Sequence, residues 1–108
     1  MMLDGPSNTA GYLATRRFLR DFPNHLVIVT ACVSLAEQTR GDFAGAWVLQ
    51  EAQKAGVGWF PNLRSLASYG ILRRTDVTRR GRRAYYTMPD IEGVKAALGE
   101  FTVGRQPV

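Results

Sequence analysis

The clustered arginines are the first feature of this 108-residue chain that indicates a specific kind of interaction. Seven arginines lie between positions 64 and 83, and the only acid among them is Asp76, so this segment carries a net charge of +6. The whole chain carries +5, so the remaining residues sum to −1. A guanidinium group can bind a phosphate through two parallel hydrogen bonds, and dense positive charge most often meets a polyanion. The segment therefore predicts contact with a phosphate backbone.

Side chains that carry out catalysis or hold metals are sparse by comparison. The chain has one histidine, His25, and one cysteine, Cys32, whereas a structural zinc site needs four ligands and a disulfide needs two thiols. The nine acidic residues form no close pair for acid–base catalysis, and no glycine-rich phosphate loop is present. We therefore expect no enzyme activity, no bound metal and no cofactor.

The composition is typical of one small packed domain. Hydrophobic residues make up 45% of the chain, which favours a folded core over disorder. The longest apolar run, 26–36, is shorter than the roughly 20 residues that cross a bilayer, and residues 1–15 do not resemble a signal peptide. The sequence thus predicts a soluble, cytoplasmic protein with no membrane partner. We expect residues 1–8 and 102–108 to be flexible.

Three helices are predicted before the basic segment. Thr9 can cap the first, which extends to about Asp21 and has one aromatic, apolar side. Residues 25–41 are rich in the β-branched residues that favour strands, but the length of the segment indicates a buried helix. Asp42 is expected to cap a third helix, which Gly56 ends.

The basic segment itself predicts a short helix and a β-hairpin. The helix covers residues 59–69 and ends at Gly70, with Phe60 on its buried face. Strands are expected over 71–77 and 84–88, followed by a last helix. Pro89 and Asp90 stop the second strand and cap this helix, which is expected over 91–101.

Two helices joined by a tight break and followed by a hairpin form a helix-turn-helix with a wing. The segments LRSLASYGIL, RRGRRAYYTM and DIEGVKAAL, in this order, resemble winged-helix transcription regulators of the PadR, MarR and ArsR type. The resemblance covers about residues 44–98. It implies a mainly α (α+β) domain over residues 9–101, with about five helices and one two-stranded β-hairpin wing.

The resemblance also implies which residues meet DNA. Residues 59–69 would be the recognition helix in the major groove, and the hairpin arginines would contact phosphates. Because neighbouring strand residues point to opposite faces, we expect only one of Arg73 and Arg74 to face nucleic acid. A solvated hairpin tip is the alternative explanation of the wing arginines. The candidate DNA-binding residues are Asn62, Arg64, Ser65, Ser68, Arg73, Arg74, Arg79, Arg80, Arg82 and Arg83.

The sequence therefore predicts a protein that binds double-stranded DNA and acts as a transcriptional regulator. A homodimer is the usual way in which such small domains gain affinity, and the aromatic side of the helix within residues 9–22 is its predicted contact. The alternative is a winged-helix module within a larger assembly, whose basic hairpin binds an acidic protein or RNA. The residues alone leave both functions open.

Overall fold

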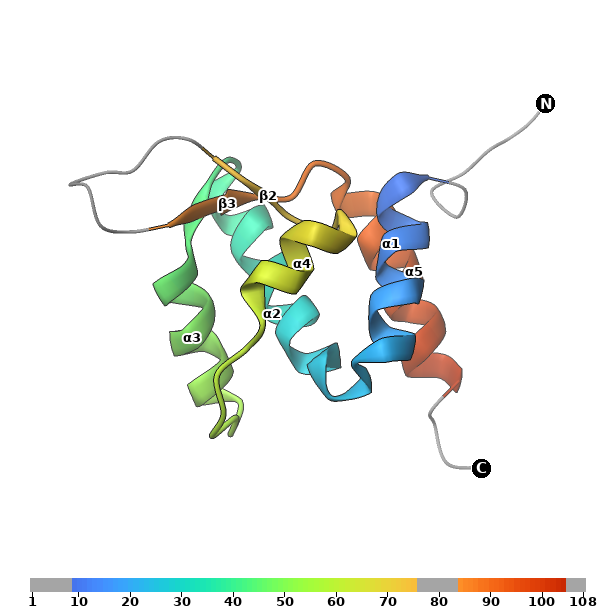
Figure 1. The fold of residues 1–108 in the computed structure, drawn as a ribbon, viewed down its shortest axis with the longest axis horizontal. Coiled ribbons are helices and arrows are strands. Elements are labelled where there is room, and N and C mark those ends of the chain that lie inside the picture. The colour runs from blue at the N-terminus through green and yellow to red at the C-terminus, as the bar shows by residue number, and fades with distance from the viewer. Residues whose placement is uncertain (1–8, 76–83, 105–108) are drawn as a thin grey trace.

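The structure, a computed structural model, describes residues 9–75 and 84–104, with side chains as far as residue 101. This part of the chain is mainly helical with a small antiparallel sheet, which confirms the mainly α (α+β) prediction. None of its helices is long and apolar enough to cross a membrane. The elements, in chain order (Figure 1), are α1 (Ala10–Asp21), the 3-10 helix η2 (Pro23–His25), α2 (Leu26–Thr39), β1 (Phe43–Ala44), α3 (Gly45–Lys54), α4 (Leu63–Tyr69), β2 (Arg73–Arg74), β3 (Tyr85–Thr87) and α5 (Ile91–Gly104).

Helix α2 is the central helix, as the length of its segment predicted. It packs against α3 and α5, and its buried residues include Ile28, Val29 and Cys32. Burial on several sides explains why the sequence reads as a continuous apolar run rather than as an amphipathic stripe. Tertiary packing overrides the strand preference of its β-branched residues.

Helices α1 and α5 lie side by side and close the core at one end (Figure 1). Thr9 caps α1 as predicted, because its Oγ1 accepts a hydrogen bond from the Tyr12 backbone N–H. Asp90 joins the two helices. Its Oδ1 accepts from the Gly93 N–H in the first turn of α5 at 3.1 Å, and its Oδ2 accepts from the Gly11 N–H of α1 at 2.9 Å.

Most of the aromatic side that was predicted as the dimer contact packs within the same chain. Its aromatic and apolar side, including Tyr12, Phe18 and Leu19, is buried within the same chain, where α5, η2 and α4 contact this helix. These side chains are therefore already covered in one molecule. Leu13 of the same helix is 52% exposed, so a homodimer through residues 9–22 stays a prediction.

The sheet of the described part has three strands rather than the two of a simple hairpin wing. Their order is β1-β3-β2, and both pairs are antiparallel. Phe43 was expected inside a helix capped by Asp42, but it forms β1 opposite Tyr86 and its side chain is fully buried. Pairing with β3 satisfies the backbone of β1, so α3 begins only at Gly45.

Helix α4 is shorter than predicted. It begins at Leu63, after Asn62 as N-cap, so the expected start at residue 59 is wrong. Residues 59–62 instead form a connection without regular structure, and Phe60, expected on the buried face, is 87% exposed. Gly70 ends the helix in the left-handed region (φ +98°), as predicted.

Candidate nucleic-acid interface

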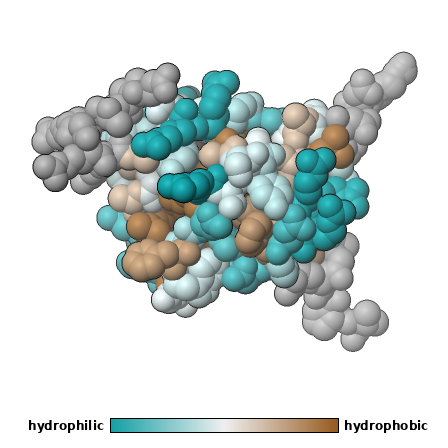
Figure 2. Space-filling model, viewed as in Figure 1, coloured by the Kyte–Doolittle hydropathy of each residue, from teal (hydrophilic) through white to brown (hydrophobic). Residues whose placement is uncertain are grey.

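The solvent-facing side of α4 carries the predicted recognition residues. Arg64 and Ser68 are exposed, whereas Ser65 is half-buried. The Ser68 hydroxyl donates to the Ser65 backbone carbonyl at 3.2 Å, which holds it against the helix. Figure 2 shows hydrophilic surface over α4 and β2 on the face turned to the viewer. The arrangement presents a polar helix surface to solvent.

Asn62 has a structural role that its sequence position did not reveal. Its Oδ1 accepts a hydrogen bond from the Ser65 N–H at 3.1 Å, so the side chain caps α4. An Asn amide that also paired with adenine would have to share this oxygen, because bidentate pairing uses both the carbonyl and the NH2 group. The helix cap and a bidentate interaction with adenine therefore both require the Oδ1 atom of Asn62.

His25 is the residue of this site that sequence reasoning missed. Its ring is only 5% exposed, and its Nε2 accepts a hydrogen bond from the Asn62 backbone N–H at 3.0 Å. Nε2 must therefore be unprotonated, and Nδ1–H donates to Asn24 Oδ1 at 2.8 Å. Burial lowers the pKa of His25 from its usual 6.5, which also favours the neutral ring. No sequence signal links His25 to a partner 37 residues away.

Aromatic rings hold this imidazole in place. The centroid of the Trp59 ring lies 4.9 Å from that of His25, and the Phe18 ring meets it edge-on at 5.4 Å. Trp59 packs against His25 but is itself 39% exposed. The start of α4 is thereby fastened to the junction between η2 and α2.

The strand β2 adds two cations beside α4. Arg73 lies opposite Thr87, and Arg74 lies opposite Tyr86. Both arginines are exposed, because β2 is at the edge of the sheet. We expected the two side chains to point to opposite faces of the strand, but neither of these faces is buried at this position. Four further candidates lie outside the described residues, namely Arg79, Arg80, Arg82 and Arg83.

The charge of this surface is not neutralised within the described part of the chain. Arg64, Arg73 and Arg74 form no ion pair or hydrogen bond with any described residue. The sequence has no acidic residue between Glu51 and Asp76. Three guanidinium groups thus remain available to an external anion.

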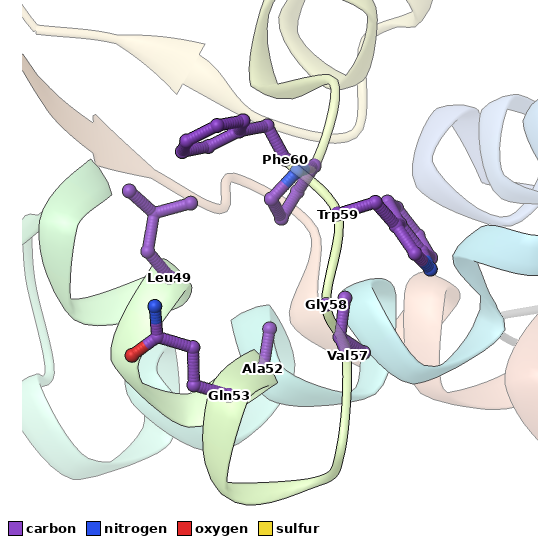
Figure 3. A pocket seen from close by; sticks show the side chains of 8 residues that line it. Leu49, Ala52, Gln53, Val57, Gly58, Trp59 and Phe60 are labelled. Carbon is purple, nitrogen blue, oxygen red and sulfur yellow. The ribbon is translucent and has the colours of Figure 1, made fainter.

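A small pocket adjoins the connection between α3 and α4. It has a volume of about 110 Å³ and includes Leu49, Val57 and Phe60 in its lining. Figure 3 shows the Phe60 ring on the side of Leu49, while Trp59 points the other way. The exposed ring places apolar surface directly beside α4. Sequence reasoning missed it because a helix over 59–69 buries Phe60.

Comparisons with known proteins identify no relative of this chain. The chain matches no family model, no curated protein and no solved structure. The resemblance to winged-helix regulators therefore stays a prediction that depends on the three quoted segments, and the site must be interpreted from its own geometry.

Proposed function

We propose that this chain is a double-stranded DNA-binding protein that acts in the cytoplasm as a transcriptional regulator. Helix α4 is inserted into the major groove, and the hairpin that contains β2 and β3 contacts the flanking phosphates. The observation that carries this proposal is the set of exposed cations without a partner among the described residues, Arg64 on α4 and Arg73 and Arg74 on β2. The proposal assigns the protein no catalytic reaction and no cofactor.

The order of elements supports a winged helix-turn-helix. Helices α3 and α4 are joined by a connection without regular structure, and β2 and β3 follow α4 (Figure 1). Strand β1 pairs with β3, and the Gly45 N–H at the start of α3 donates to the Ala84 carbonyl at 3.0 Å. The hairpin is thus fastened to the helices, so basic groups on both units keep a fixed relation to one another.

The proposed interactions with DNA divide into two kinds. Arg64, Arg73 and Arg74 are proposed to bind phosphates or guanine edges, together with the wing arginines 79, 80, 82 and 83. Ser68 and the free NH2 of Asn62 are proposed to face the base edges, with Ser65 supporting the cap. Phosphate contacts position the protein, whereas base contacts discriminate between sequences.

Binding to a fluorescent duplex over a range of salt concentrations tests the proposal. Removing one arginine–phosphate interaction should reduce the slope of log K against log salt by about 0.9. The variant Arg73→Ala, Arg74→Ala should therefore reduce it by up to about 1.8. Lys95→Ala is the matched control, since it removes one exposed cation on α5, where Lys95 pairs with Glu37 at 2.8 Å. It should leave the slope unchanged.

Two results would count against DNA binding. Absence of binding at low salt would leave the second candidate, a module that binds an acidic protein or RNA in a larger assembly. The 87% exposed Phe60 is the observation that favours that candidate, because exposed aromatic residues are common at protein interfaces. An unchanged slope in the Arg73→Ala, Arg74→Ala variant, with the fold intact, would remove β2 from the interface.

A further inference from the structure

A second basic surface lies in a groove between α1 and α5. The groove has a volume of about 460 Å³ and is lined by Leu13, Arg16, Arg17, Arg20 and Phe101. Leu13 is 52% exposed, and Phe101 is half-buried. The groove thus combines two apolar side chains with three guanidinium groups. Figure 2 shows hydrophilic surface over α1 on the face turned to the viewer.

The arginines of this groove are only partly neutralised. Arg16 lies 3.9 Å from Glu100 Oε1. Arg17 and Arg20 form no ion pair or hydrogen bond with the described residues. The other acid of this region, Asp21 of α1, accepts a hydrogen bond from the Tyr69 hydroxyl at 2.6 Å. Positive charge therefore remains beside exposed apolar surface.

We propose that this groove docks an amphipathic helix of a partner protein, whose apolar side covers Leu13 and Phe101 and whose carboxylates pair with Arg17 and Arg20. Charge complementarity selects an acidic partner. An exposed leucine is unfavourable in water, and burying it stabilises a protein complex, whereas a phosphate backbone gains nothing from it. The mixed chemistry of the groove therefore favours a peptide over a nucleic acid.

A second copy of this chain does not supply such a helix. The acids on its described helices mostly have a cation beside them, since Glu37 pairs with Lys95, Glu51 with Lys54 and Glu100 with Arg16. The chain also carries a net charge of +5, so two copies repel one another. The occupant is therefore a different, acidic protein. This inference does not depend on the proposed function.

Two synthetic amphipathic helices test the groove with the full chain. They share their leucines and differ only in carrying glutamate or lysine on the polar side. Fluorescence anisotropy should detect binding of the glutamate peptide and little binding of the lysine peptide. Arg17→Ala with Arg20→Ala should weaken the glutamate peptide about tenfold, and Leu13→Ser by a similar factor. Lys95→Ala, the control, should change nothing.

The charge-reversed variant Arg17→Glu, Arg20→Glu keeps the proposal testable. It should invert the preference and bind the lysine peptide, and circular dichroism should show an unchanged fold because all substituted side chains are exposed. Equal binding of both peptides, or unchanged binding by Leu13→Ser, would overturn the proposal.

Two other occupants give distinct results. Self-association that sedimentation detects and Leu13→Ser abolishes would mean that a second copy fills the groove. Displacement of the glutamate peptide by duplex DNA, with the salt slope reduced by Arg17→Ala and Arg20→Ala, would assign the groove to phosphates. Either result overturns the acidic partner, whereas the tests on Arg73 and Arg74 decide DNA binding separately.

Discussion

His25 links the core to the candidate interface, so its replacement tests how α4 is positioned. In His25→Phe the ring is kept for the interactions with Phe18 and Trp59, but the Nε2 acceptor is absent. The Asn62 N–H is then left without its partner. A buried donor left unsatisfied costs about 1–3 kcal/mol of stability, and the exposure of Asn62 favours the lower end. Each kcal/mol lowers the Tm of a domain of this size by roughly 4–8 °C.

The role of His25 can also be tested through the pH dependence of the free energy of unfolding. Because burial lowers the pKa of folded His25 below 6.5, the unfolded chain binds more protons than the folded chain as pH falls below that value. The free energy of unfolding is therefore highest above pH 6.5 and decreases as pH falls toward the folded-state pKa. One proton can account for at most about 1.4 kcal/mol per pH unit.

No other side chain of the protein obscures this titration. His25 is the only histidine, and carboxylates titrate mainly below about pH 5. The elements around it carry the charged residues Arg16, Arg17, Arg20 and Asp21 on α1, Glu37 on α2 and Arg64 on α4. Burial is the cause of the lowered pKa of His25.

Urea denaturation at about pH 7.5 and about pH 5.5, followed by circular dichroism, measures both effects. Wild type should lose stability between the two values, and His25→Phe should not. His25→Gln is the matched control, because it keeps an acceptor but cannot titrate. The explanation fails if wild type and His25→Phe lose the same free energy on acidification, since the folded ring would then titrate as the unfolded one does.

Two further substitutions test the ends of α4. Asn62→Ala should lower stability by about 1 kcal/mol through loss of the cap, whereas Asn62→Ser should keep the cap. Equal melting temperatures of the two variants would contradict the capping role. If Asn62 also reads a base, both variants should relax the motif selected from random DNA. Gly70→Ala should cost more than about 1 kcal/mol, because a φ of +98° is unfavourable for a residue with a Cβ atom. An unchanged Tm would show that the helix end adjusts.

Short-range signals in the sequence predicted most of the helices. Thr9 and Asp90 cap α1 and α5, and Gly70 ends α4, because caps depend on a few neighbouring residues. Helix α2 was predicted from the length of its segment. Arg64 and Ser68, two of the candidate DNA-binding residues, are exposed on α4. These features need no knowledge of distant parts of the chain.

Long-range pairings account for what the sequence did not reveal. Strand β1 exists because Phe43 meets Tyr86, and no local pattern at residues 42–44 indicates that partner. The hydrogen bond from Asn62 to His25 likewise joins residues that are distant in the sequence. The burial of the aromatic side of α1 depends on α5 at the other end of the chain. An apolar stripe alone does not tell whether its partner is the same molecule or another.

The shortness of α4 explains why these long-range interactions matter for the interface. A seven-residue helix is unstable by itself, since isolated helices shorter than about 12 residues are marginal in water. The helix is held by its Asn62 cap, by the fully buried Leu66, and by the Ile71 and Leu72 N–H groups, which both donate to the Leu66 carbonyl. The direction in which Arg64 points therefore depends on the core. Under the proposed DNA-binding function, substitutions of these supporting residues should weaken binding to all DNA sequences alike, because they displace the whole helix instead of removing one base interaction.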